Sequence, residues 1–285
     1  MLYRVTRDSL SEAADLHGQF TGETVFLVCP GPSLADADLD LLRQRGIVTL
    51  GINTSYLTFR PTIWLSADRP ACFPTLVYQD PGVLKVARRG LAHVRVAGRQ
   101  LCECPHIVFL YLAHGDRFDG SLFTEPARWY PKCFIIAVQL AWWLGFTRIV
   151  TVGTDFTITP ERQYAHGAPL SRYYVNTNKG VYANTLTILR RLLPDLTARG
   201  VSMVNTTQPS GLDFVPHSPL RDAVAEALAG KALDMTARPL PHAMALRADR
   251  RARRPAAGTD PAPPPPDLAT AALALQQQFV KRADR

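Results

Sequence analysis

The chain has 285 residues, of which 47% are hydrophobic and 20% charged, so it can bury a sizeable core in one large α/β domain, with or without a tail. An ordinary membrane-spanning helix is excluded because no run of eighteen apolar residues occurs, and the N-terminal segment lacks the apolar centre of a signal peptide. We therefore expect a cytoplasmic protein, at most peripheral to a membrane.

The net charge of +8 is concentrated near the end of the chain. Residues 231–285 contain ten Lys or Arg and five Asp or Glu, a net +5, which leaves +3 for residues 1–230. We predict one folded domain over 1–230 and a basic, Pro- and Ala-rich tail over 231–285, largely disordered, with a short helix at 268–283. Such a tail favours contact with an anionic surface, and its helix either supports a homo-oligomer or stays solvated.

The first half of the chain alternates short apolar runs with polar turns. TVFLVC at 24–29 is β-branched and apolar, as suits a strand buried on both faces. ADADLDLLRQRG at 35–46 has acids at its front, apolar residues at helical spacing and a final Gly, which together predict a helix. Strands are predicted at 24–29, 47–53, 62–68, 85–98 and 106–115.

The second half repeats this alternation with longer helices. PKCFIIAVQLAWWLGF at 131–146 is long and apolar but too short to span a bilayer, so we predict a helix buried against a sheet. A central strand at 147–156, an amphipathic helix at 180–200 and a last strand at 201–207 follow. Repeated strand–helix units with apolar strands predict an α/β fold with a doubly wound, mostly parallel, Rossmann-like sheet.

The cysteines favour no metal site. Their number is odd, no CxxC spacing occurs, and the one CxC has no second pair of ligands at suitable spacing. Reduced structural thiols are therefore predicted at Cys29, Cys72, Cys102, Cys104 and Cys133.

Small and polar residues follow four of the predicted strands. In an open parallel sheet, ligands bind beyond the carboxyl ends of the strands, so these residues predict a small-molecule crevice with a polar rim. They are Pro30, Gly31, Pro32 and Ser33; then Asn53 and Thr54; then Asp68; then Gly153, Thr154 and Asp155.

The loop PGPSL supports two interpretations. Backbone N–H groups at the start of the following helix favour a phosphate, and Gly31 would permit its close approach. Alternatively, Ser33 is a simple N-cap in a strand-to-helix turn. The loop lacks the spacing of a G-x-G-x-x-G motif and the Lys of a P-loop.

The other strand-end residues also carry alternatives. Asn53 can bond to a base or ribose, or close an Asx-turn. Asp68 and Asp155 can hold a ribose hydroxyl, a metal or an acceptor sugar, or cap helices. Residues 157–182 predict a lid over the crevice. Candidates on it are Tyr164, His166, Asn176 and Tyr182, with His166 as the titratable base near neutral pH.

These motifs, in this order, resemble bacterial CMP-sialic-acid-dependent sialyltransferases. The stretches VCPGPSLADAD, LGINTSY, LGFTRIVTVGTDF, YAH and ARGVSMVNTTQPSGL carry the resemblance over about residues 22–215. They are also similar to the wider superfamily of 6-hydroxymethylpterin diphosphokinase-like proteins and Maf-type flagellin glycosyltransferases.

The resemblance implies a GT-A-like sialyltransferase variant of the Rossmann fold that holds a CMP-sugar without an obligatory metal. It also implies that the GPSL loop and Asn53 contact the nucleotide, that Tyr164 steadies the leaving phosphate, and that a lid histidine deprotonates the acceptor. The chain departs from the pattern in having Pro30 where those enzymes commonly have Asn. Their lid histidine aligns near Asn176 or Thr177, so His166 is the residue left for that role.

We therefore expect a glycosyltransferase that moves a sugar, from a CMP-activated acidic donor, to an acceptor hydroxyl on a glycan, lipid, protein or modified nucleic acid. It requires no cofactor beyond the nucleotide-sugar donor. One alternative is an ATP- and Mg²⁺-dependent diphosphokinase-like phosphotransferase with Asp68 and Asp155 on the metal side. Another is a non-catalytic nucleotide-sugar binder.

Overall fold

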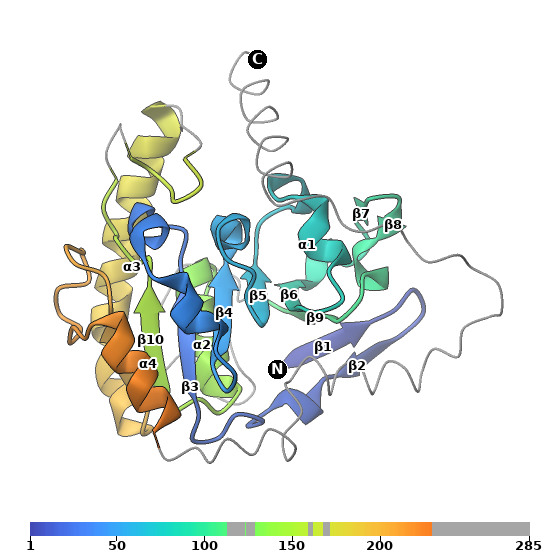
Figure 1. The fold of residues 1–285 in the computed structure, drawn as a ribbon. Coiled ribbons are helices and arrows are strands. Elements are labelled where there is room, and N and C mark those ends of the chain that lie inside the picture. Colours follow the sequence, from blue (N-terminus) through green and yellow to red (C-terminus); the bar gives the residue numbers. More distant parts are fainter. Residues whose placement is uncertain (113–122, 124–128, 159–161, 168–171, 230–285) are drawn as a thin grey trace.

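A computed structural model describes residues 1–112, 123, 129–158, 162–167 and 172–229. Its main feature is a nine-stranded sheet in the order β11-β10-β3-β4-β5-β6-β9-β1-β2, beside a two-stranded ribbon β7-β8. All neighbours from β11 to β9 are parallel, while β1 runs antiparallel to both β9 and β2. The mostly parallel α/β fold predicted from the sequence is confirmed (Figure 1).

The predicted strands are present with shorter bounds, because the turns begin before the apolar runs end. Alternate residues of β3 face opposite sides, with Val25 and Leu27 in one core and Phe26 and Val28 in the other. The strands of the main sheet are β1 (Leu2–Val5), β2 (Leu10–Glu12), β3 (Thr24–Val28), β4 (Val48–Ile52), β5 (Ile63–Ser66), β6 (Leu84–Arg88), β9 (Ile107–Leu110), β10 (Arg148–Val152) and β11 (Ser202–Asn205).

Helices cover both faces of the sheet. α2 (Cys133–Trp143) and α3 (Arg172–Ala198) pack on one face, and α4 (Leu220–Leu228) packs on the other. Among the described helices, none is long and apolar enough to cross a bilayer. The short helices are α1 (Thr75–Gln79) and the 3-10 helices Ala14–Leu16, Pro32–Asp36, Leu39–Arg43, Asn53–Leu57, Pro70–Cys72, Arg89–Leu91 and Leu101–Glu103.

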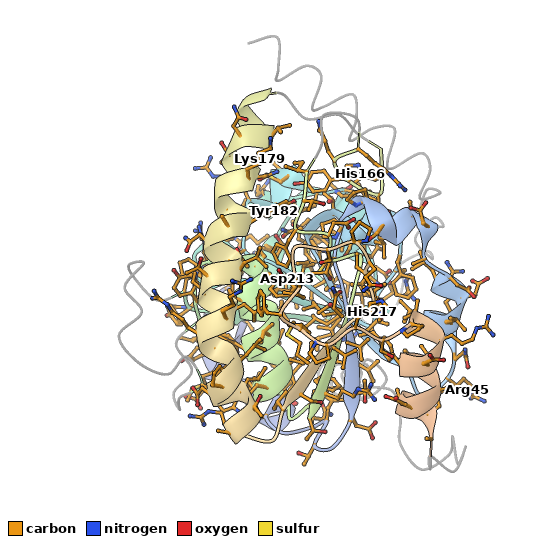
Figure 2. The ribbon with its side chains drawn as sticks, turned by 90° about the vertical axis from the view of Figure 1, so that its left-hand side faces the viewer. Arg45, His166, Lys179, Tyr182, Asp213 and His217 are labelled. Carbon is orange, nitrogen blue, oxygen red and sulfur yellow. The ribbon has the colours of Figure 1, made fainter. Side chains whose placement is uncertain are left out.

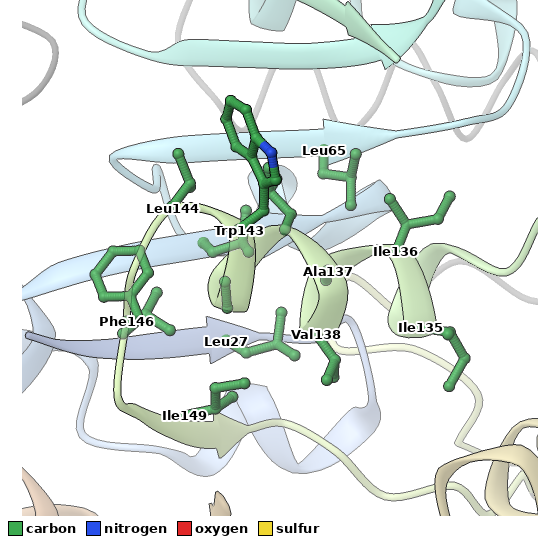
Figure 3. Packing of buried hydrophobic residues seen from close by; sticks show 14 of the residues in the cluster. Leu27, Leu65, Ile135, Ile136, Ala137, Val138, Trp143, Leu144, Phe146 and Ile149 are labelled. Atoms are coloured by element: carbon green, nitrogen blue, oxygen red, sulfur yellow. The ribbon is translucent and has the colours of Figure 1, made fainter. Parts of the chain in front are cut away.

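The helix predicted at 131–146 is confirmed as α2. It is apolar on every side because it lies between the sheet and α3, as a helix without a polar face must. Figure 3 shows Ile136 and Val138 of α2 packed with Leu27 of β3 and Leu65 of β5. Gly145 ends the helix in a left-handed conformation (φ +96°), where a Cβ would come within 2.9 Å of the Thr21 nitrogen.

The single helix predicted at 35–46 is wrong. Two 3-10 helices, Pro32–Asp36 and Leu39–Arg43, stand there instead, because Ala37 between them is extended (φ −75°, ψ 144°). The break lets Leu34 and Leu42 both enter the core beneath α4. The dipole of a long helix is therefore absent behind PGPSL.

Other boundaries also differ from the prediction. The stretch 85–98 holds β6, a 3-10 turn and the first strand of the ribbon β7 (Arg95–Val96) and β8 (Arg99–Gln100). Part of the expected lid at 157–182 is helical, since α3 begins at Arg172. The sequence did not predict β1, β2, α1 and α4. The predicted tail at 231–285, with its helix at 268–283, lies outside the described residues.

From β3 onward, the chain changes direction across the sheet once. It runs outward from β3 through β4, β5 and β6 to β9, and then returns to place β10 and β11 on the other side of β3. This puts a topological switch point between β3 and β10. Such points leave a crevice at the carboxyl ends of the two strands.

Candidate functional site

A cavity of about 390 Å³ lies at this switch point. Its walls come from the carboxyl ends of β3, β4, β5 and β10, the start of α2, the segment at Tyr164 and one face of α3. A volume of this order suits a small molecule. The lining residues outside the sequence prediction include Lys132, Cys133, Phe156 and Asn178.

Most residues singled out from the sequence meet in this cavity. Those lining it are Pro30, Gly31, Asn53, Asp68, Gly153, Thr154, Asp155, Tyr164 and Tyr182. Five others, Pro32, Ser33, Thr54, His166 and Asn176, are not part of its wall.

The PGPSL loop is tied to the end of β10. The Gly31 N–H donates to the Gly153 carbonyl at 3.0 Å, and a Cβ on Gly31 would lie 2.1 Å from Asp155 Oδ2. Asp155 accepts a hydrogen bond from the Ser33 hydroxyl at 2.8 Å and two longer ones, at 3.3 Å, from the Ser33 N–H. Glycine is needed here because two loops approach closely.

This contact argues against the phosphate interpretation of the PGPSL loop at Ser33. The donors of Ser33 already face the carboxylate of Asp155, which stands where the sequence suggested an anionic ligand. A phosphate at that point would also meet the negative charge of Asp155. Burial raises the pKa of Asp155 although the Ser33 hydrogen bonds act to lower it.

Three hydrogen bonds hold segment 162–167, part of the predicted lid, to the PGPSL loop and the 3-10 helix that follows it. The Ala165 N–H donates to the Pro30 carbonyl at 3.1 Å. Arg162 donates from Nη2 to the Pro32 carbonyl at 3.1 Å and to Asp36 at 2.7 Å. The segment is thus held beside the cavity mouth.

His166 lies behind the cavity wall and not in it. Its ring stacks on that of Tyr164 with 5.3 Å between the centroids, so Tyr164 faces the cavity and His166 is beyond. Figure 2 shows His166 across from the turns of α3 that carry Lys179 and Tyr182. Burial lowers the pKa of His166, which keeps the ring neutral near pH 7.

One face of α3 lines the cavity. Asn178, Val181, Tyr182 and Thr185 recur at a spacing of three to four residues, as residues on one helical face do. Asn176 is two positions away from Asn178 and is exposed on another face. The same spacing, measured from Tyr182, could have identified Asn178 from the sequence.

The Tyr164 hydroxyl is positioned by two neighbours. Asn178 Nδ2 donates to its oxygen at 3.1 Å, and the Tyr182 hydroxyl also hydrogen-bonds to it. Burial raises the pKa of Tyr164, so the group stays protonated. Its own proton is then available to an oxygen in the cavity.

Backbone strain occurs at two points of the cavity wall. Asn53 and Phe156 have φ of +50° and +49°, in the left-handed region that residues other than glycine rarely adopt. The Asn53 carbonyl accepts from Trp64 Nε1 at 2.8 Å, and its Oδ1 accepts from the Ser66 hydroxyl at 3.2 Å. The Asn53 side chain is also hydrogen-bonded to the Cys133 thiol, which lines the same cavity.

Two acidic side chains and one basic side chain are among the described lining residues, namely Asp68, Asp155 and Lys132. The Asp68 carboxylate has no hydrogen bond or ion pair with any residue that the structure describes. Restricted access of water raises the pKa of Asp68, and the charge of Arg88 offsets only part of this effect. Asp68 is therefore the cavity carboxylate that is open to a ligand.

The cysteines are free, as predicted. Cys29 and Cys133 line the cavity, and burial raises the pKa of each thiol to about 12. Both remain neutral thiols at ordinary pH, which argues against either one as a nucleophile.

Comparison with protein-family models, curated proteins and solved structures finds no match for this chain. Within the described ranges, no cluster of three or more His, Cys, Asp or Glu side chains is arranged to hold a metal ion.

Proposed function

We propose that this cavity binds a CMP-linked acidic sugar and that the protein is a metal-independent glycosyltransferase with a Rossmann-like, GT-A-like fold. The observation that carries the proposal is the convergence, at one topological switch point, of nine residues singled out from separate parts of the sequence. A polar crevice at that position is where α/β proteins bind nucleotides.

The donor phosphate is assigned to two side chains that line the cavity, Tyr164 and Lys132. Lys132 is the one cation among the lining residues that the structure describes, and the Tyr164 hydroxyl keeps its proton to donate. Both groups stabilise the negative charge that develops on the leaving phosphate. The PGPSL loop, whose Ser33 donors face Asp155, instead forms a neutral wall.

Asp68 is assigned as the general base in place of His166. Asp68 lines the cavity and accepts no hydrogen bond from a described side chain, whereas His166 lies behind Tyr164. In the step, the acceptor oxygen forms a bond to the anomeric carbon as the bond from that carbon to the phosphate oxygen breaks. CMP leaves with that electron pair, and the acceptor proton passes to Asp68.

The Mg²⁺-dependent alternative needs both Asp68 and Asp155 as metal-side carboxylates. The oxygens of Asp155 are occupied by the Ser33 hydroxyl and N–H, which weakens that reading.

The test is CMP release from CMP-sialic acid and from CMP-Kdo, with EDTA present and water as acceptor. We expect release by the wild-type chain and near-complete loss in Asp68→Asn. Formation of AMP from ATP, strictly dependent on Mg²⁺, would overturn the proposal in favour of a phosphotransferase. CMP binding without release from either donor would leave only a nucleotide-sugar binder.

A further inference from the structure

Three arginines follow consecutive strands beyond the cavity. Arg69 comes after β5, Arg88 ends β6 and Arg89 follows it. The pairing of Ser66 with Ala87, and of Arg88 with Leu110, places these strand ends side by side. In the described part of the chain none of the three has an ion pair, whereas Arg4, Arg60 and Arg162 each pair with an aspartate.

Arg88 is the member nearest the cavity. It follows Leu84 and Val86, which face α2, so alternation puts its side chain on that face of the sheet. Ala67, which directly follows the Ser66–Ala87 pair at the end of β5, lines the cavity, and the charge of Arg88 acts on Asp68. Arg88 therefore stands at the rim, next to the assigned base.

Arg89 lies on the other face of the sheet from Arg88, as alternation along β6 predicts. Its guanidinium lies over the Tyr111 ring, 4.3 Å from the centroid, and Tyr111 packs edge-to-face on Tyr3. Tyr111 is 43% exposed, which is unusual for a large aromatic side chain in the described chain. Arginine beside an exposed aromatic ring offers both charge and a flat apolar face.

This surface selects a particular class of ligand. Unpaired guanidinium groups favour carboxylates and phosphates, to which they bind with two parallel hydrogen bonds. Three arginines supply fewer phosphate contacts than the about six to ten made by a protein that binds duplex DNA with a strong salt dependence. A small saccharide that carries one acidic group fits Arg88 at the rim and Arg69 after the neighbouring strand.

We propose that the acceptor is an acidic saccharide whose carboxylate or phosphate is held by Arg88 and Arg69, at the rim beside Asp68. This inference rests on the glycosyl transfer proposed above. Binding there brings an acceptor hydroxyl to the base while the CMP-sugar fills the cavity.

The test measures saccharide binding directly by NMR titration, so that it does not depend on transfer. Sialyllactose is compared with lactose for a carboxylate, and galactose 6-phosphate with galactose for a phosphate. We expect the acidic member of at least one pair to bind more tightly, and Arg88→Gln to weaken that binding by about tenfold or more. The pair that shows the preference identifies the anionic group.

Arg45→Gln is the matched control, because Arg45 is exposed and lies far from this rim, near α4 in Figure 2. It should bind like the wild-type chain. Equal binding of acidic and neutral saccharides, an unchanged affinity in Arg88→Gln, or tighter binding of a short RNA would overturn the inference. A parallel CMP titration separates the two proposals, since lost CMP binding with acidic-saccharide binding intact would contradict only the donor assignment.

Discussion

Strands β5 and β6 carry charged residues at both ends, and the two ends differ in how those charges are satisfied. At the amino-terminal end, Asp80 accepts hydrogen bonds from Arg60 at 2.6 and 2.8 Å, from the Tyr56 hydroxyl at 2.7 Å and from the Gly82 N–H at 2.8 Å. At the carboxyl-terminal end, Asp68 and Arg88 have no such partners among the described residues. The paired charges around Asp80 stabilise the fold, whereas the unpaired charges of Asp68 and Arg88 are available to bind a ligand.

Lys85 makes the contrast sharper. It is fully buried in β6, and its ammonium donates to the carbonyls of Asp80 at 2.5 Å and Val83 at 2.9 Å. Burial lowers the pKa of Lys85 to about 8, with partial compensation from Asp80. Arg88, three residues along the same strand, is partly exposed beside the cavity. A charge that folding buries requires internal partners, whereas a charge kept without them can recognise a ligand.

The largest expected effect is at Asp68. Asp68→Asn removes the proposed base and should lower the rate of CMP release by about 10²- to 10⁴-fold. The melting temperature should not change, because the carboxylate has no described hydrogen-bond partner to lose. His166→Ala, assayed in parallel, should release CMP at close to the wild-type rate. The reverse pattern would return the base to the lid histidine.

Substitution of Asp80, at the amino-terminal end of β5 and β6, should lower the stability of the fold. Asp80→Asn leaves Arg60 and Tyr56 without their carboxylate, and we expect the free energy of unfolding to fall by about 2–4 kcal/mol. Urea denaturation followed by circular dichroism measures it. Asp195→Asn, which breaks a surface pair with Arg199, should cost at most about 0.5 kcal/mol. If Asp80→Asn and Asp195→Asn lowered the free energy of unfolding equally, the structural role assigned to Asp80 would be wrong.

Lys132 should affect the affinity for the donor. Lys132→Ala removes the cation assigned to the phosphate, so the Kd for CMP should rise by about ten- to a hundredfold. Lys179→Ala is the control, since Lys179 is exposed on α3 and does not line the cavity (Figure 2). Calorimetry measures both. An unchanged Kd in Lys132→Ala would place the phosphate elsewhere.

The smallest expected effect is a decrease in the free energy of unfolding at acidic pH, caused by protonation of Asp80. Burial alone would raise the pKa of Asp80, but the hydrogen bonds from Arg60 and Tyr56 outweigh it and lower the pKa to about 2. An unfolded aspartate titrates near 3.9. The stability that Asp80 contributes is therefore complete above about pH 4 and lost as the pH falls towards 2. The free energies of unfolding of the wild type and of Asp80→Asn, both measured with urea, should therefore become more alike as the pH falls from about 4 to about 2.

The parallel strands and α2 could be predicted from the sequence because their continuous apolar runs indicate elements that are buried on every side. The sequence also located nine lining residues, since residues that follow parallel strands meet at one edge of the sheet. It failed where the outcome depends on contacts between distant segments. Ser33 donates to a residue 122 positions away, and the extended Ala37 follows from packing beneath α4. The hairpin β1–β2 has too short an apolar pattern to predict.

The most direct test of the central claim is a calorimetric titration of CMP, UMP and AMP into the folded wild-type chain in the presence of EDTA. A cytidine-nucleotide site at the switch point predicts binding of one CMP per chain, with UMP and AMP at least about tenfold weaker. Absence of heat with CMP, from protein whose circular dichroism shows it to be folded, would contradict the account.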